Sequence, residues 1–222
     1  MCAVSAKHAE NLEIFSNYLR HQDDTLPEIA NSIQIWEACR ATAAASSFFE
    51  PIAIGPKDNM KVRFVDGATL ANNPVNEVWS EARRQFGPNF ESRVQLLVSI
   101  GTGMPAIRTY EGSLAEVLKT LVKMATDTET THRRFEGAHE YLVKNHVFYR
   151  FNVQRGMEKV SLEQASEREH VTIMTSNYMT DPDVREKVQR LKDRARMDRG
   201  KSITRVPELT AAPRRLIRTL DK

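Results

Sequence analysis

Long apolar runs and cysteines are scarce in this chain of 222 residues, and each scarcity excludes a class of protein. The longest apolar stretch, Leu96 to Ile100, is far too short to cross a bilayer, so we expect no transmembrane helix. The two cysteines, Cys2 and Cys39, make no disulfide framework and fit a reducing compartment. No secretory signal peptide is visible in the charged N-terminal segment. We therefore expect a cytoplasmic protein, with peripheral contact to membranes as its only membrane association.

The motifs of the common cofactor and metal sites are also missing. There is no P-loop, dinucleotide-binding fingerprint or zinc knuckle. His132, Glu136, His139 and Glu140 share one face of a predicted helix, which permits a metal site. The segment lacks His-Glu-x-x-His and is otherwise charged, so we favour a solvated surface. We expect no metal and no cofactor.

The net charge of +3 is unevenly distributed along the chain. Residues 181–222 contain 13 Lys and Arg against 7 Asp and Glu, whereas residues 1–180 contain 19 against 22. A basic segment of this kind fits peripheral contact with an anionic membrane through residues 181–222, and the alternative is a solvated helix face with a loose tail. Nucleic acid is not an expected partner, because the basic residues are interleaved with acids and lack nearby aromatic residues.

The pattern of apolar residues predicts an α/β fold. We expect strands at 2–6, 61–65, 94–100 and 147–153, and helices at 33–47, 74–86, 113–126, about 130–144 and from 181 onwards. Residues 7–30 are expected to be irregular. Strand, helix and strand over residues 61–100 predict a βαβ unit, with the two strands parallel and the helix capped by Asn73. The apolar strand at 94–100 should be covered by helices on both faces.

This organisation predicts a mostly parallel sheet flanked by helices, incomplete at its N-terminus, with a C-terminal helical tail. We divide the chain into residues 1–155 as the α/β part, 156–199 as a helical extension and 200–222 as a poorly ordered basic tail. The chain begins directly in a strand, which suggests a truncated gene product or a fragment of a longer protein.

Asp66 is the strongest candidate for a functional residue. It ends a predicted strand, and Gly67 follows it, while Gly101 and Gly103 follow the next predicted strand. In a parallel sheet both turns would lie at the carboxyl edge, where open α/β sheets bind ligands. A carboxylate there can take a proton from a serine hydroxyl, and the alternative is an ordinary Asp-Gly turn. For the glycines, ligand binding and a tight turn both remain open.

Three sequence blocks resemble the patatin-like phospholipase family, and they occur in the family's order. They are Ile35–Ala45, the turn Val65-Asp66-Gly67-Ala68 with Ala71-Asn72-Asn73-Pro74, and Val98–Gly103. Tyr149–Val153 and its acidic sequel are similar to the continuation of fungal members. The chain therefore resembles the C-terminal portion of a patatin-like domain.

This resemblance implies a Ser-Asp dyad that hydrolyses fatty acyl esters of glycerolipids or phospholipids. Asp66 aligns with the dyad aspartate, which orients and deprotonates the serine. The family carries that serine on Gly-x-Ser-x-Gly after a glycine-rich oxyanion loop, and neither motif occurs in this chain. None of Ser46, Ser47 and Ser99 has the glycines on both sides that an elbow needs, so we expect them to be helix-end and strand residues.

Two possible functions follow from the presence of Asp66 and the absence of the serine motif. The first is a lipid acyl hydrolase that lacks its nucleophile and is inactive as this chain. The alternative is a non-catalytic lipid-binding or interaction module. Arg40 could bind a lipid phosphate, but an ion pair with Glu37 or another acid is the expected role. Trp36 is expected to pack in the core or against the sheet.

Overall fold

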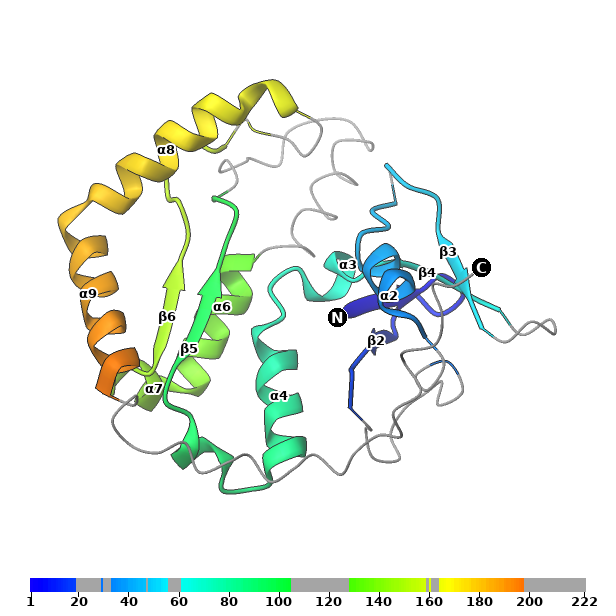
Figure 1. Ribbon diagram of the computed structural model, residues 1–222, viewed down its shortest axis with the longest axis horizontal. Helices are drawn as coiled ribbons and strands as arrows, with labels where there is room; N and C mark the ends of the chain where they lie inside the picture. The colour runs from blue at the N-terminus through cyan, green and yellow to red at the C-terminus, as the bar shows by residue number, and fades with distance from the viewer. Residues whose placement is uncertain are drawn as a thin grey trace, which may run out of the picture. The chain divides into compact units, whose positions relative to one another are not determined.

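The computed structural model describes residues 1–18, 29, 33–46, 48–55, 61–104, 128–158, 160 and 164–197. These residues form two compact units, and the boundary falls between Ala71 and Asn72. The predicted helix at 113–126 and the predicted tail at 200–222 lie outside the described residues. Figure 1 shows the elements of both units.

The described residues of the first unit form a four-stranded sheet and two helices. Its strands are β1 (Cys2–Ser5), β2 (Leu12–Ile14), β3 (Ile52–Ile54) and β4 (Val62–Asp66), and its helices are α2 (Ile35–Thr42) and α3 (Ala68–Ala71). The strand order is β2-β1-β4-β3, and every described neighbouring pair is antiparallel. In the register of β1 and β4, Ala3 lies opposite Asp66 and Ser5 lies opposite Phe64.

The core of this unit lies between the sheet and α2. Phe64 of β4 is fully buried, and its ring meets that of Phe15 edge to face at 5.3 Å. The inner face of α2 is Ala38 and Ala41, whose small side chains let the helix lie close to the strands. The helix begins after Gln34, whose backbone N–H donates to the Glu37 carboxylate at 2.8 Å. A small-residue helix against the sheet was predicted and is confirmed.

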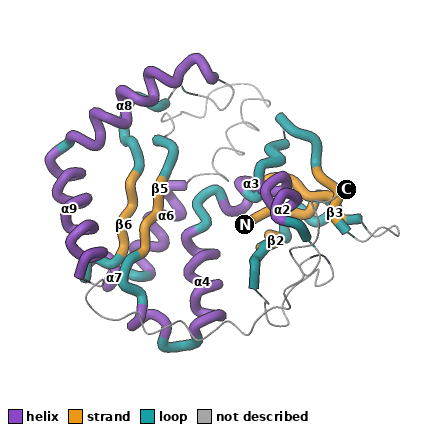
Figure 2. The backbone as a smooth tube through the Cα atoms, in the orientation of Figure 1, coloured by secondary structure: helices purple, strands orange, loops and turns teal. Residues whose placement is uncertain are grey.

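The second unit places a two-stranded parallel sheet among helices. It contains α4 (Val75–Phe86), a 3₁₀ turn (Phe90–Arg93), β5 (Leu97–Ile100), α6 (Thr128–Ala138), α7 (Glu140–Lys144), β6 (Phe148–Phe151), a 3₁₀ turn (Ala165–Glu167), α8 (Arg168–Thr180) and α9 (Pro182–Met197). Figure 2 shows β5 and β6 side by side, and their register pairs Ser99 with Arg150. Trp79, Phe90, Phe135 and Phe148 form the aromatic centre of its core.

One part of the predicted topology is wrong. The strand that ends at Asp66 does not form a parallel pair with the strand at 97–100. Both edges of β4 are already occupied, by β1 and β3, and the parallel partner of β5 is β6. The error arose because strand, helix and strand in succession favour a βαβ unit, while the three-residue strands β2 and β3 are too short to show a period. The parallel pair in the structure joins strands separated by residues 101–147 instead.

Two smaller expectations also need correction. Asn73 does not cap α4, because its side chain bonds elsewhere in the unit, as described below. The strand at 97–100 is not covered on both faces by the described residues, since Val98 and Ile100 are exposed. Helices at 128–144 and from 182, and the strand at 148–151, are confirmed.

We expect Phe64→Ala to lower the free energy of unfolding by about 3–5 kcal/mol, because it removes a fully buried ring and leaves a cavity. Urea denaturation of the purified chain measures this. Phe48→Ala is the matched control, since that ring is exposed in the same unit, and its change should stay within about 0.5 kcal/mol. Equal losses in the two variants would contradict the core described here.

Candidate active site

Asp66 is held at the end of β4 by two hydrogen bonds. Its backbone N–H donates to the carbonyl of Ala44, just beyond α2, at 2.9 Å. Its Oδ1 accepts the backbone N–H of Ala68, the first residue of α3, at 2.8 Å. No described residue donates to Oδ2, and the side chain is only half-buried. The carboxylate is therefore fixed in direction and retains an oxygen that can accept a proton.

Gly67 is required by a close approach of two backbones. A Cβ at this position would lie 2.4 Å from the carbonyl oxygen of Cys2 on β1, a distance that no side chain tolerates. The absence of a side chain lets the chain turn from β4 into α3 directly over the start of β1. The glycine next to the aspartate thus serves the turn that orients Asp66.

The predicted glycines of the second strand lie in the other unit, against side chains from β6 and the residues after it. A Cβ on Gly101 would lie 2.3 Å from Oδ1 of Asn152, and one on Gly103 would lie 2.6 Å from Cβ of Met157. Gly103 also has a φ of 110° and donates its N–H to Oδ1 of Asn152 at 2.7 Å. The space beside both glycines is filled by protein, which favours the tight-turn alternative. Their proximity to Asp66 stays a prediction.

A buried polar network that the sequence analysis missed lies at the end of the parallel pair. Arg150 of β6 is 7% exposed, and its Nη2 forms an ion pair with Oε1 of Glu129 at 2.9 Å. Its Nη1 donates to the Ser99 hydroxyl at 3.0 Å, and that hydroxyl donates to Oδ1 of Asn73 at 3.4 Å. The Asn73 amide completes this series of hydrogen bonds by donating to the carbonyl of Thr128 at 3.0 Å.

This network explains the residues of the Asn72-Asn73-Pro74 segment in physical terms. Buried Asn73 connects the start of α4 to α6 and β5, and the Arg150 charge that supports it is balanced by Glu129. Asn152 also donates to Glu129, at 2.8 Å. A signal was present in the sequence, because a strand places Arg150 on the same face as Phe148, and the aromatic segment Phe148-Tyr149-Arg150-Phe151 favours a buried strand.

None of the described serines provides a nucleophile elbow. Ser99 is a strand residue, as expected, and its hydroxyl is engaged by Arg150 and Asn73. Ser46 lies in an exposed turn after α2, and Ser47 lies outside the described residues. No serine nucleophile beside Asp66 is therefore identified among the described residues.

The histidine cluster is divided between the end of one helix and the start of the next. His139 precedes α7, and its ring stacks on Phe135 at 4.4 Å. His132 lies 3.4 Å from Glu136, and burial is the largest cause that lowers the pKa of His132. Within the described ranges, no group of three His, Cys, Asp or Glu side chains is arranged to hold a metal ion. The described helices also include none with the length and apolarity needed to cross a membrane.

The exposure of Trp36 and the contacts of Arg40, both on α2, differ from the prediction. Trp36 is 60% exposed, so its predicted place in the core is wrong. Arg40 donates to the backbone carbonyl of Glu50 at 2.7 Å, and its guanidinium lies over the Phe49 ring at 5.4 Å. The Glu37 carboxylate, one predicted partner of Arg40, binds the backbone at the start of the helix.

The fold and the site define an α/β chain in which a strand-end aspartate precedes a glycine turn. Residues 4–79, which include α2, Asp66 and Asn72-Asn73-Pro74, match the family described as patatin-like phospholipase. Over these residues the chain is similar to that family, and the resemblance seen in the first two sequence blocks is confirmed there. The block at 98–103 lies beyond the match.

Three curated proteins show a similarity that extends over about half of this chain. The chain is 30% identical over 124 residues to calcium-independent phospholipase A2-gamma of Mus musculus, a match that covers 54% of this chain and 14% of the mouse protein. It is 31% identical over 124 residues to the Homo sapiens protein of that name, with the same coverage. It is 31% identical over 111 residues to an intracellular phospholipase A2 of Caenorhabditis elegans, covering 45% of this chain and 10% of that protein. The chain spans only a small part of the relatives it matches.

We expect Gly67→Ala to destabilise the chain by about 1–3 kcal/mol, because the new methyl group would collide with the Cys2 carbonyl. Gly137→Ala is the matched control. A Cβ there meets nothing within 4 Å and lies on α6, so the change should stabilise slightly, by about 0.5 kcal/mol. Denaturant unfolding of both variants measures the difference, and a neutral Gly67→Ala would show that the β1 backbone does not approach the turn.

We expect Arg150→Ala to cost about 3–5 kcal/mol of stability, because it leaves the Glu129 carboxylate without its buried counter-charge. The control is Lys144→Ala, which breaks an exposed pair with Glu140 and should cost less than about 1 kcal/mol. A double-mutant cycle with Glu129→Ala isolates the pair. Strictly additive losses would mean that the two side chains do not interact.

Proposed function

We propose that this chain is part of a lipid acyl hydrolase that cleaves the carboxylic esters of glycerolipids or phospholipids. The observation that carries the proposal is Asp66, which lies within the matched residues and presents an oxygen that no described residue occupies. The matched relatives are named as phospholipases, which supports a lipid ester as the substrate class. We expect a cytoplasmic location with peripheral membrane contact.

In the proposed reaction Asp66 is the base of a Ser-Asp dyad. Its carboxylate takes the proton of a serine hydroxyl as that oxygen attacks the ester carbonyl. The proton passes to the departing alcohol, and an acyl group remains on the serine. Water then attacks the acyl ester with Asp66 as base, which releases the fatty acid and restores the serine. The bond from Oδ1 to the Ala68 N–H keeps the carboxylate oriented throughout.

The proposal includes inactivity of this chain on its own. No Gly-x-Ser-x-Gly segment occurs in its sequence, and none of the three candidate serines has a glycine at both motif positions. Loss of the serine nucleophile from a serine hydrolase lowers turnover by about 10⁶. The dyad serine therefore has to come from a polypeptide segment other than the one in this sequence.

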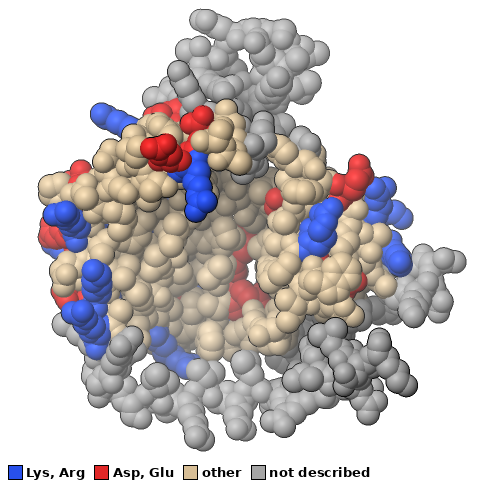
Figure 3. Space-filling view, turned by 45° about the horizontal axis from the view of Figure 1, so that its top comes forward, with Lys and Arg blue, Asp and Glu red and all other residues tan. Residues whose placement is uncertain are grey.

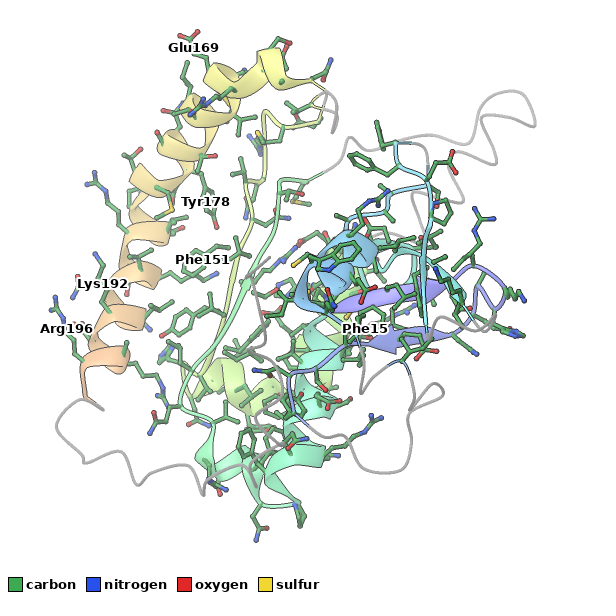
Figure 4. The ribbon with its side chains drawn as sticks, turned by 45° about the vertical axis from the view of Figure 1, so that its right-hand side comes forward. Phe15, Phe151, Glu169, Tyr178, Lys192 and Arg196 are labelled. Atoms are coloured by element: carbon green, nitrogen blue, oxygen red, sulfur yellow. The ribbon has the colours of Figure 1, made fainter. Side chains whose placement is uncertain are left out.

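A second candidate function is a non-catalytic lipid-binding module that uses the basic segment. Several cations of α9 are engaged within their own unit. Lys187 donates to the Arg150 carbonyl at 3.1 Å, Arg194 donates to the Asn145 carbonyl at 2.9 Å, and Arg190 pairs with Glu186. Figure 4 shows Lys192 and Arg196 on the side of α9 turned away from the strands.

The surface along α9 is also mixed in charge. Lys and Arg side chains alternate with Asp and Glu side chains along the left edge of Figure 3, where α9 lies. Membrane binding through residues 181–222 would be salt-sensitive and would require anionic lipid. The engaged cations make this function the weaker candidate for the described part of the segment.

The first test assays the purified chain on a short-chain acyl ester, with Asp66→Asn beside it. We expect no turnover above the buffer rate in either protein, because the nucleophile is missing. Turnover by the chain that Asp66→Asn abolishes would reveal a serine or cysteine nucleophile within these 222 residues, and the inactivity proposal would then be wrong.

The second test asks whether the Asp66 turn supports catalysis beside a nucleophile. Residues 61–74 replace the corresponding segment of the mouse calcium-independent phospholipase A2-gamma. We expect the chimera to hydrolyse phospholipid and to lose about 10⁴-fold in kcat on Asp66→Asn, the scale seen when a catalytic aspartate is made neutral. Arg63→Gln, on the same strand, is the control and should keep the activity. An active Asp66→Asn chimera would remove Asp66 from the mechanism.

A further inference from the structure

Helix α2 carries its large apolar side chains on the outward side. Ala38 and Ala41 face the sheet, whereas Ile35 and Trp36 are 73% and 60% exposed. A helix on the surface of a soluble domain normally shows the reverse arrangement, with large apolar residues inward. Burying Trp36 requires an apolar surface that the described part of its own unit does not supply.

The turn that follows α2 extends the same surface. The backbone N–H groups of Phe48 and Phe49 both donate to the Ala45 carbonyl at 2.9 Å, which ties this turn to the end of α2. Both rings are exposed. Arg40 lies one helical turn after Trp36 and places its guanidinium over the Phe49 ring. Ile35, Trp36, Arg40, Phe48 and Phe49 together make one surface, which we name the aromatic face.

The aromatic face is connected directly to Asp66. The Asp66 N–H binds the Ala44 carbonyl between α2 and the aromatic turn, so the two are held in one unit. Leu70, on the helix that follows Asp66, is another exposed apolar side chain of this unit. In this unit, exposed apolar side chains therefore lie on the segments before and after Asp66 in the sequence. These segments are α2 with the turn that follows it, and α3.

We propose that the aromatic face docks on the surface of a neutral phospholipid bilayer. Trp and Phe side chains favour the interface between lipid and water. Glu37, Arg40 and Glu50 lie in this region, so its charges give no attraction to anionic lipid. This inference rests on the proposed function, because a hydrolase of bilayer lipids must bring Asp66 to the lipid surface.

The test measures binding of the full chain to phosphatidylcholine vesicles by sedimentation, at low and at high salt. We expect binding that salt does not weaken and that Trp36→Ser with Phe49→Ser reduces about tenfold or more. Val78→Ser is the control. It removes a side chain that is equally exposed but lies in the other unit, so binding should be unchanged. Circular dichroism verifies that the variants fold.

The two tryptophans give a second, independent measurement. Trp36 is exposed and Trp79 is 5% exposed, so only Trp36 should respond to a bilayer. We expect vesicles with brominated acyl chains to quench the emission of the chain and to leave that of Trp36→Phe unchanged. Failure to bind phosphatidylcholine would overturn the inference. Binding that disappears at high salt or on deletion of residues 181–222 would overturn it as well, as would a dimer or a protein complex that Trp36→Ser dissociates.

The result of the vesicle-binding test can be separated from the result of the test of the proposed function. Asp66→Asn should leave vesicle binding unchanged, because Asp66 is not one of the residues of the aromatic face. If the chimera is active and the vesicles are not bound, the docking inference alone is wrong. If the vesicles are bound and the chimera is inactive, the docking surface remains and the hydrolase proposal is wrong.

Discussion

The turn at Asp66 depends on the close approach between the β1 backbone and Gly67. Because Gly67 has no side chain, β4 can end directly over Cys2, and Ala68 can return its N–H to the Asp66 carboxylate. The same residue is tied to Ala44 beyond α2. A single turn thus joins the sheet, α2 and α3, and the orientation of the candidate catalytic group follows from packing that is local to one unit.

The second unit buries a charged side chain, that of Arg150, in a unit whose core is aromatic. The charge of Arg150 is balanced by Glu129. Arg150 also donates a hydrogen bond to the Ser99 hydroxyl, which donates to the Asn73 side chain. Breaking such a network at one point leaves a buried charge unpaired, which is costly. The residues that follow the aspartate turn in the sequence are therefore fixed by contacts with β5, β6 and α6.

Much of the element content could be predicted, because long helices and apolar strands carry their period in the sequence. The helix from 182, with Val184, Val188 and Leu191 on one face, and the strand at 148–151 are examples. The short strands β2 and β3 could not be predicted, since three residues show no period. Without them, β4 was given a parallel partner that the sheet order excludes.

The sequence by itself determined the family resemblance, the identity of Asp66 as the candidate base and the lack of a Gly-x-Ser-x-Gly nucleophile, because these depend on residue types at fixed spacing. Only the tertiary structure decided that β4 is antiparallel to both neighbours, that Arg150 supports Asn73 and that Trp36 faces outward. Strand partners, buried ion pairs and exposure are set by contacts between residues far apart in the chain, and local periodicity contains no information about such contacts.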